Sequence, residues 1–285
     1  MIRYHDVNGG LRQKYTASFR LDDLGLLRGY GIFDYFLVRQ GVPMFWDDYA
    51  DRFYRSARLL GLEVPIAPEE LRQRIARLLE ANRERNTAIR LLLTGGYADD
   101  NYTPTEPNLA IMQHAMPSVA PERYEEGIKL MLYRHLREVP EVKSTNYLTG
   151  IRIRELLKQA GAPEVLYHDG RLVSESARSN FFIVTAEGVL VTPAEQVLHG
   201  VTRKHVLELA QQAGIRTEVR DLTLDELPRA AEAFLTSTIK GVLPVVQIDE
   251  LRIGEGRPGP VSRRLRELWQ NHVADYIARH QPFKR

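Results

Sequence analysis

One lysine, Lys143, lies in a segment whose residue types could support chemistry on an aldehyde. The segment Glu141–Tyr147 (EVKSTNY) is predicted to join a loop to a helix. A lone lysine in such a place is usually an exposed surface charge. The alternative is an amine that forms a Schiff base, which requires burial to lower its pKa. The residues of this segment alone leave both interpretations open.

A carboxylate and two anion-binding candidates follow later in the chain. Glu175–Asn180 (ESARSN) precedes an apolar strand, and its glutamate is either a turn residue or a carboxylate that keeps a pyridinium nitrogen protonated. Gly200–Thr202 precedes an amphipathic helix, where it is either an ordinary N-cap or a phosphate site at a helix N-terminus. Thr236–Thr238 ends a strand with consecutive hydroxyl groups, which could complete an oxyanion site.

Motifs of other enzyme classes are missing from the sequence. It contains no P-loop, no H-E-x-x-H pair and no G-x-S-x-G element, and its 8 histidines lack ligand spacing, so no metal site is expected. Cysteine is absent, which excludes disulfides and thiolate chemistry. Ser237–Lys240 fits S-x-x-K without its companion motifs. Gly29–Gly31 leads into a strand instead of the helix that a dinucleotide site needs.

The balance of charge argues against several classes of partner. The chain has 39 basic and 37 acidic residues, and its net charge of +2 is too small to indicate nucleic-acid binding. The first ten residues lack the apolar segment of a secretory signal. Apolar runs such as Val242–Val246 are far shorter than the ~20 residues that span a bilayer. We therefore expect a cytoplasmic protein that binds neither nucleic acid nor membrane.

Hydrophobic periodicity predicts interleaved strands and helices in two parts of the chain. The first part has strands at Tyr30–Arg39, Val42–Trp46, Ala88–Thr94 and Asn108–His114 and helices at Asp47–Gly61 and Pro68–Arg83. The second has strands at Ile128–His135, Glu164–His168, Asn180–Thr185, Val189–Val191, Arg216–Asp221 and Ala233–Thr236 and helices at Asn146–Gln159, Thr202–Ala213, Leu224–Ala230 and Pro260–Arg279. This order indicates an α+β (mixed α/β) fold. Residues 116–122 are predicted to link a small N-terminal domain, 1–115, to a larger C-terminal domain, 123–285.

Taken in order, the four segments resemble the motifs of the class IV pyridoxal-phosphate-dependent aminotransferases, the fold-type IV enzymes. The matching patterns are K-S-x-N, E-x-x-x-S-N-[FV]-F, L-x-G-[IV]-T-R and F-L-[ST]-S-T. Tyr49–Ala57 is also similar to the early helix H-x-x-R-L-x-x-S-A of this family, so the resemblance covers most of the chain. The family includes branched-chain transaminases, D-amino-acid transaminases and aminodeoxychorismate lyase.

The resemblance implies that pyridoxal 5′-phosphate binds between the two domains. Lys143 would hold it as an internal aldimine and shuttle a proton, and Glu175 would keep the ring nitrogen protonated. Tyr147 would lie near the cofactor O3′ atom. An arginine, a helix N-terminus and hydroxyl groups would bind the phosphate. The cofactor-binding residues implied in this way are Arg52, Lys143, Tyr147, Glu175, Ser179, Asn180, Gly200, Val201, Thr202, Ser237 and Thr238.

Arginines near the first long strand are the expected substrate-binding residues. Arg90 in an apolar strand could form a structural ion pair or, with Arg28, a carboxylate clamp to which a partner subunit contributes. Phe33–Leu37 stands where branched-chain enzymes of the family carry F-E-G-[IL]-R, and it lacks that element. The substrate-binding residues implied are Arg28, Tyr30, Phe33, Arg90 and Arg178.

The chain therefore most resembles a divergent D-amino-acid transaminase. The resemblance implies a homodimer with active sites at the subunit interface, acting on D-alanine, D-glutamate and the matching 2-oxo acids. An L-branched-chain transaminase and an aminodeoxychorismate lyase are the alternatives within the family. A non-catalytic cofactor-binding or scaffold protein is the alternative outside it.

Overall fold

The computed structural model describes residues 2–283, which form two compact units. The first unit comprises the described residues through Pro117, Val142–Asn146 and the described residues from Val273 onward. The second comprises Ser118–Glu141 and Tyr147–His272. Two stretches of the first unit thus follow the predicted linker in sequence, so the units do not coincide with two consecutive parts of the chain.

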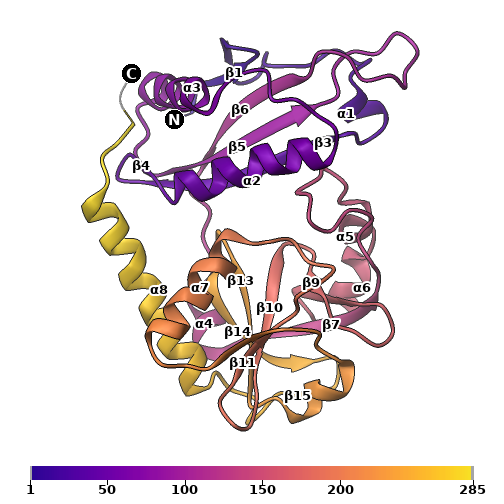
Figure 1. Cartoon of the computed structure of the whole chain (residues 1–285), viewed down its shortest axis with the longest axis vertical. Coiled ribbons are helices and arrows are strands. Elements are labelled where there is room, and N and C mark those ends of the chain that lie inside the picture. The colour runs from indigo at the N-terminus through magenta and orange to yellow at the C-terminus, as the bar shows by residue number, and fades with distance from the viewer. Residues whose placement is uncertain (1, 284–285) are drawn as a thin grey trace. The chain divides into compact units, whose positions relative to one another are not determined.

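The first unit is built on a six-stranded antiparallel sheet in the order β2-β1-β6-β5-β3-β4 (Figure 1). Its strands are β1 (Tyr4–Val7), β2 (Gly10–Gln13), β3 (Gly31–Arg39), β4 (Val42–Pro43), β5 (Thr87–Thr94) and β6 (Asn108–Ala115). Its helices are α1 (Leu24–Leu27), α2 (Trp46–Leu59) and α3 (Pro68–Asn82). Apolar positions of α2 and α3 at helical spacing are buried, as their predicted amphipathic pattern requires.

Helices α2 and α3 cover the same face of this sheet. Asp34 of β3 pairs with Arg52 of α2, and Asp6 of β1 pairs with Arg77 of α3. Cross-strand pairs connect the two aspartates through one residue each of β5 and β6, and directly paired residues point to the same side. The intervening positions of these strands therefore point to the opposite face.

Two parts of the first unit differ from the sequence prediction. The hairpin of β1 and β2 was not predicted, although its turn Asn8-Gly9 has the positive φ angles (48° and 85°) that this residue pair favours. The predicted strand Val42–Trp46 was wrong in extent. β4 ends at Pro43, and α2 begins at Trp46 after Phe45 takes a left-handed conformation (φ 49°), which breaks the extended chain.

The second unit is built on a nine-stranded mixed sheet. Seven strands follow the order β12-β11-β10-β13-β14-β7-β8, with β15 beside β14 and β9 beside β10 (Figure 1). The strands are β7 (Ile128–Arg134), β8 (Glu164–His168), β9 (Glu175–Ser176), β10 (Ser179–Val184), β11 (Leu190–Thr192), β12 (Thr217–Val219), β13 (Glu232–Ser237), β14 (Gly241–Ile248) and β15 (Leu251–Arg252). The helices are α4 (Glu122–Glu126), α5 (Leu148–Arg152), α6 (Arg154–Gln159), α7 (Val201–Gln212), the 3₁₀ helix η1 (Leu224–Arg229) and α8 (Pro260–Arg279), whose last residues belong to the first unit. Helices combined with mixed sheets confirm the predicted α+β class.

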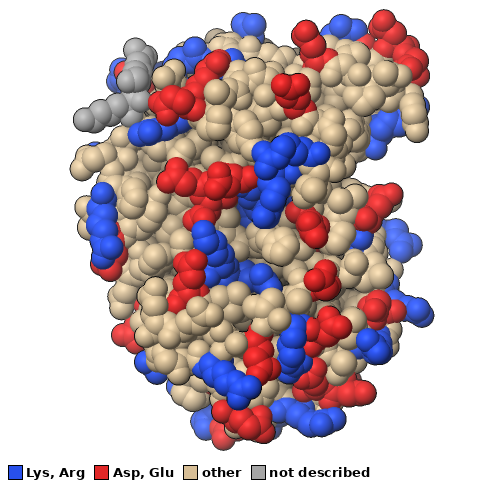
Figure 2. Space-filling view, viewed as in Figure 1, with Lys and Arg blue, Asp and Glu red and all other residues tan. Residues whose placement is uncertain are grey.

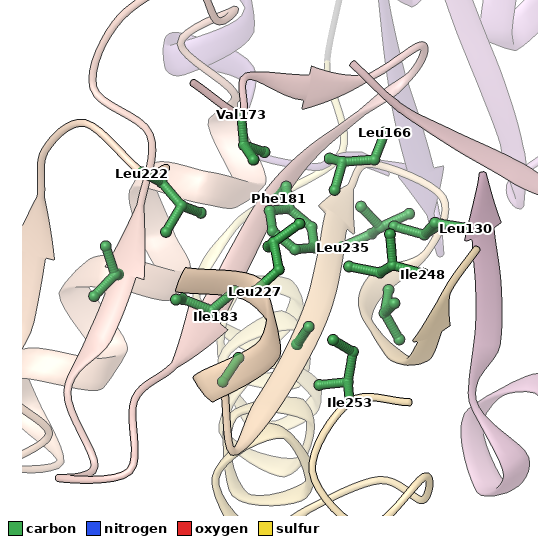
Figure 3. Packing of buried hydrophobic residues seen from close by; sticks show 14 of the residues in the cluster. Leu130, Leu166, Val173, Phe181, Ile183, Leu222, Leu227, Leu235, Ile248 and Ile253 are labelled. Carbon is green, nitrogen blue, oxygen red and sulfur yellow. The ribbon is translucent and has the colours of Figure 1, made fainter. Parts of the chain in front are cut away.

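Both faces of the second sheet are buried. Phe181 and Leu235 belong to one apolar cluster, shown in Figure 3, whereas their neighbours Phe182 and Phe234 belong to another that includes residues of α7 and α8. The rings of Phe182 and Phe234 stack with centroids 4.9 Å apart. Successive strand residues point to opposite faces, so a strand buried on both sides has the continuous apolar sequence seen in β10.

Two elements of the second unit differ from the prediction. The segment Gly241–Ile248 forms the interior strand β14, although it contains Pro244, a residue that argues against an interior strand because it lacks an N–H group. The single helix predicted over Asn146–Gln159 is divided into α5 and α6 at Ile153. Ile153 is buried in an apolar cluster with Val165 and Tyr167.

Two further features of the described part of the chain concern its helices and its surface charge. None of its helices combines the length and apolar character that a membrane crossing requires. Figure 2 shows basic and acidic side chains interspersed on the visible face. This pattern agrees with the nearly balanced composition of the sequence.

Candidate active site

Lys143 lies on a short extended segment beside β3 of the first unit. The Phe33 N–H donates to the Lys143 carbonyl oxygen (2.9 Å), and the Lys143 N–H donates to Ser56 Oγ of α2 (3.3 Å). Its side chain is only partly exposed, and Nζ lies 4.8 Å from the centroid of the Phe33 ring. Two hydrogen bonds therefore hold the backbone of Lys143, and its side chain is less exposed than that of a typical surface lysine.

Arg52 is a buried arginine whose position is fixed by Asp34. Its Nε donates to Asp34 Oδ2 (2.9 Å) and its Nη2 to Asp34 Oδ1 (2.6 Å), and the two side chains are only 6% and 0% exposed. Nη1 takes no part in this bidentate pair. Sequence patterns found the arginine but not the aspartate, because Asp34 reads as one polar residue in an apolar strand.

Replacing Asp34 by asparagine is expected to destabilise the protein strongly. Asp34→Asn leaves the Arg52 cation buried without its counter-charge, a loss of about 3–5 kcal/mol in the free energy of unfolding. Urea denaturation of both proteins measures the difference. The matched control is Asp22→Asn, which removes the partly exposed partner of Arg20 and should cost at most about 1 kcal/mol. Equal losses for the two variants would contradict this account.

Arg90 lies on the face of the first sheet that α2 and α3 do not cover. It pairs across strands with Tyr35, next to Asp34 in β3. Its guanidinium carbon lies 5.0 Å from the Phe33 ring centroid and 5.7 Å from the Tyr35 ring centroid. Among residues 2–283 it forms no ion pair, and its buried Nε has no hydrogen-bond partner. The structural ion pair considered for Arg90 is therefore not present.

The other substrate-site candidates of the first unit have different surroundings. Arg28 is exposed at the end of α1, and its Nε donates to the Asn101 carbonyl oxygen (3.0 Å). Tyr30 is half-buried and donates its hydroxyl to the Leu60 carbonyl oxygen (2.5 Å). The guanidinium groups of Arg28 and Arg90 thus contact different partners within this chain.

Glu175 is a buried carboxylate surrounded by hydrogen-bond donors in the second unit. Oε1 accepts from Arg137 Nη1 (2.8 Å), and Oε2 accepts from Asn180 Nδ2 (3.0 Å) and from the Leu198 N–H (3.1 Å). Its side chain is 5% exposed. Three donors favour the ionised form. Glu175 is part of β9, so the alternative of a simple turn residue does not hold.

Asn180 connects Glu175 to the beginning of α7. Its Nδ2 also donates to the Leu198 carbonyl oxygen (2.8 Å), two residues before the helix N-cap Gly200. A Cβ atom at Gly200 would lie 2.0 Å from Asn180 Oδ1, so only glycine permits this approach. The first turn of α7, which begins with buried Val201, contains no acidic residue.

Several hydroxyl groups lie at this end of the second sheet. Thr202 Oγ1 in the first turn of α7 and Thr236 Oγ1 in β13 are buried and have no hydrogen-bond partner among the described residues. Thr236 pairs across strands with Asn180. Ser237 Oγ accepts from the Lys240 N–H (3.3 Å), and half-buried Thr238 follows it. Unused buried hydroxyls and a helix N-terminus without acids suit a phosphate dianion.

An ionic cluster with a buried glutamate lies beside these hydroxyls. Lys240 Nζ contacts Glu164 Oε1 (2.8 Å) and donates to Ser179 Oγ (2.8 Å), and Arg178 contacts the same glutamate at 3.3 Å. Burial acts to raise the pKa of Glu164, but the charge and hydrogen bond of Lys240 bring it below its ordinary value. Arg178 is mostly exposed (67%). The sequence marked Lys240 only as the end of an incomplete S-x-x-K motif, and it gave no signal for Glu164, which lies far from Lys240 in the chain.

Tyr147 and Arg137 belong to a group of aromatic and charged residues in the second unit. Burial raises the pKa of Tyr167 to about 12, and the charges of Arg137, Tyr147 and Glu175 also act on it. Tyr147 is the N-cap of α5. Arg137, which is 17% exposed, also donates to the Pro140 carbonyl oxygen (3.0 Å). The sequence analysis did not single out Arg137. Its position shortly before the Lys143 segment could have marked it as a candidate partner for a carboxylate of the site.

These residues fit pyridoxal 5′-phosphate. An ionised buried glutamate suits a protonated ring nitrogen, and the α7 N-terminus with the unpartnered Thr202 hydroxyl suits a phosphate. In the described residues, no three His, Cys, Asp or Glu side chains are grouped as ligands of a metal ion. The chemistry of the donors therefore points to an organic, anionic cofactor.

Comparisons with known proteins agree with this chemistry. Residues 31–248 match the family model for amino-transferase class IV. The chain is 28% identical to a D-alanine aminotransferase of Bacillus licheniformis, over 95% of this chain and 98% of that protein. It is 32% identical to a putative branched-chain-amino-acid aminotransferase of Methanocaldococcus jannaschii, over 93% and 94%.

A solved structure shows the same fold. It is the T.th. branched-chain amino acid aminotransferase with pyridoxamine 5′-phosphate, which matches with a TM-score of 0.88 and 27% identity over 97% of this chain and 95% of that one. The family match covers most of the chain and the fold agrees throughout, so the resemblance inferred from the motifs is confirmed. The chain belongs to the class IV aminotransferases, the fold-type IV enzymes that depend on pyridoxal 5′-phosphate.

Proposed function

We propose that this enzyme transfers the amino group between a D-amino acid, such as D-alanine or D-glutamate, and a 2-oxo acid. The proposal rests on the positions of Lys143 and Arg90, whose charged groups both lie close to the ring of Phe33. Lys143 Nζ and the Arg90 guanidinium carbon lie 4.8 and 5.0 Å from the Phe33 centroid, so they are at most about 10 Å apart. An amino acid that reacts at Lys143 would have a carboxylate within reach of Arg90.

Support for D-amino acids comes from the relatives and from the first strand. Several of the similar curated proteins are D-alanine aminotransferases, with 27–29% identity over most of the chain. Phe33–Leu37 lacks the F-E-G-[IL]-R element of branched-chain enzymes. Arg90 has no acidic partner in the described chain, so its charge is available for a substrate carboxylate.

The proposed cofactor contacts follow from the two groups of residues. When bound, pyridoxal phosphate supplies an electron sink that makes the substrate Cα proton acidic. Lys143 Nζ would bind the cofactor aldehyde and then accept and return that proton. Glu175 would accept a hydrogen bond from the ring nitrogen, and Tyr147 would lie near O3′. Residues proposed to bind the phosphate, directly or by shaping its site, are Arg52, Ser179, Asn180, Gly200, Val201, Thr202, Ser237 and Thr238.

The proposed substrate contacts include a second subunit. Arg28 is exposed in the chain, so we assign it to the active site of a partner in a homodimer, where it would complete the clamp with Arg90. Tyr30, Phe33 and Arg178 are the further proposed substrate contacts. The same proposal includes two domains joined by a linker at residues 116–122 and a cytoplasmic location. It includes no membrane or nucleic-acid partner.

A branched-chain L-amino-acid transaminase is the second candidate. The Methanocaldococcus jannaschii relative, at 32% identity, carries that name as a putative activity. The T.th. structure carries it as well. These likenesses extend over nearly the whole chain, so they favour this activity over the lyase of the same family.

Paired enantiomers distinguish the two candidates. The holoenzyme is mixed separately with D-alanine, L-alanine, D-glutamate, L-glutamate and L-leucine, and the change in cofactor absorbance is followed by stopped flow. We expect the D enantiomers to react at least about tenfold faster than their L counterparts, because pocket contacts commonly discriminate by that much or more. Faster reaction of L-leucine than of both D-amino acids would replace the proposal by the second candidate.

A further inference from the structure

Lys240 holds the turn between β13 and β14 in place. Its N–H donates to Ser237 Oγ (3.3 Å) at the start of the turn. Its carbonyl oxygen accepts from the Tyr124 hydroxyl of α4 (2.9 Å). Its side chain is 11% exposed, and Nζ contacts Glu164 of β8 and Ser179 of β10. Lys240 therefore ties the turn to three other elements of the second unit.

The contact with Lys240 decides how the Ser179 hydroxyl can bond. An ammonium group has only donor hydrogens, so Ser179 Oγ is the acceptor of the 2.8 Å bond from Lys240 Nζ. Within residues 2–283 this hydroxyl makes no other hydrogen bond, so its own hydrogen has no acceptor there. Ser179 is only 6% exposed, and buried polar groups almost always have partners. A ligand with acceptor oxygens would supply the missing one.

Ser179 lies at the end of the second sheet where the phosphate is proposed to bind. Asn180 pairs across strands with Thr236, so the next positions in this antiparallel register bring Ser179 opposite Ser237. Directly paired residues point to the same side of a sheet. Thr238, a further proposed phosphate contact, follows in the turn. Hydroxyl groups from two neighbouring strands and their turn are therefore gathered at this end of the sheet.

Positive charge exceeds negative charge around Lys240. Glu164 Oε1 contacts both Lys240 Nζ (2.8 Å) and Arg178 Nη2 (3.3 Å), so one carboxylate faces two cations and the three groups have a formal charge of +1. Burial lowers the pKa of Lys240, Glu164 opposes this effect, and the charges of Arg178 and Arg123 add to it. An excess of positive charge favours a nearby anion.

We propose that Lys240 is a positioning residue for the cofactor phosphate. It fixes the turn that contains Thr238, and its bond to Ser179 leaves the hydroxyl hydrogen of that serine to donate to a phosphate oxygen. Lys240 acts through these groups, because its own Nζ is bonded to Glu164 and Ser179. This inference rests on the phosphate contacts of the proposed function.

Binding of the amine form of the cofactor, with and without its phosphate, tests this role. Pyridoxamine 5′-phosphate and pyridoxamine, which form no covalent bond with a lysine, are titrated calorimetrically into the full-length protein after its cofactor has been removed. We expect Lys240→Met to weaken binding of the phosphorylated compound about tenfold, close to the worth of one hydrogen bond to a charged group. Binding of pyridoxamine should change less than about twofold, because it lacks the phosphate. The ³¹P NMR resonance of the bound compound should also shift.

Two further variants separate positioning from folding. Lys129→Met removes another lysine of the second unit, which pairs with Glu250 (3.1 Å), and it should leave both affinities and the ³¹P resonance unchanged. Glu164→Gln combined with Lys240→Met removes both members of the buried pair, so neither charge is left without its partner. This double variant should melt near the wild-type temperature. It should still bind pyridoxamine 5′-phosphate as weakly as Lys240→Met, because the bond to Ser179 is missing in both.

Three results would overturn the role of Lys240. The first is a Lys240→Met protein that melts like the wild type and binds pyridoxamine 5′-phosphate within about twofold of the wild-type affinity. The second is an equal loss for both compounds. The third is full recovery of affinity in the double variant, which would mean that Lys240 only neutralises Glu164. Reaction of the wild-type holoenzyme with D-alanine tests the proposed function separately, and its failure would leave these binding results standing.

Discussion

Replacing Lys143 by alanine is expected to abolish transamination and the cofactor's visible absorbance. The side-chain amine is the group proposed to bind the aldehyde and to move the Cα proton. Loss of a positioned proton carrier alone costs about 10²–10⁴ in rate, and loss of the covalent attachment adds to it. Single-turnover rates with D-alanine and absorbance spectra of the purified protein measure both effects.

A matched control separates chemistry from folding. Lys158→Ala removes an exposed lysine of α6 and should leave rate and spectrum unchanged. The backbone bonds of residue 143 to Phe33 and Ser56 do not depend on its side chain, so the alanine variant should unfold at nearly the same temperature as the wild type. We expect Lys143→Ala to lower the rate at least about 10²-fold. A variant that keeps the visible absorbance and more than about a tenth of the wild-type rate would refute the assignment.

Replacing Glu175 by glutamine is expected to have the second-largest effect. Gln keeps the shape of the side chain but removes its charge, and its NH₂ group must face one of the donors Arg137, Asn180 or the Leu198 N–H. The proposed partner of the ring nitrogen is then lost, and the Arg137 cation loses its counter-charge. We expect a rate loss of about 10²–10³, the scale seen when one electrostatic partner of a developing charge is removed.

Glu175→Asp is the informative companion variant. It keeps the negative charge but shortens the side chain. We therefore expect it to retain the absorbance of the cofactor with a protonated ring better than the glutamine variant does. Spectra recorded as a function of pH, together with single-turnover rates and melting temperatures, distinguish the two substitutions. Equal spectra and equal rates for both variants would show that the charge at position 175 has no part in the reaction.

Local sequence patterns singled out candidate site residues that lie in short segments of the chain. Glu175 begins β9 and Gly200 is the N-cap of α7, and at such places a few neighbouring residues determine the backbone. Motif order along the chain then indicated the family, which the comparisons confirm. The same reasoning predicted most long strands and helices, because hydrophobic periodicity is itself a local property.

Partners that are distant in sequence were not predictable in this way. Asp34 is separated from Arg52 by a strand, a turn and part of a helix, and Arg137 meets Glu175 only because β7 and β9 belong to one unit. β14 was not among the predicted strands; it contains Pro244, which has no N–H group for a central strand. Such cases require knowledge of which elements pack together.

The amino-acid order alone determined the enzyme class and the cofactor, because these depend on short motifs whose order along the chain is typical of the family. Tertiary structure decided which charges are satisfied. It gives Arg52 and Glu175 buried partners, and it leaves Arg90 and His114 without any among the described residues. The physical reason is that the energy of a charge depends on its burial and on neighbours brought close by folding, and neither quantity is written in the local sequence.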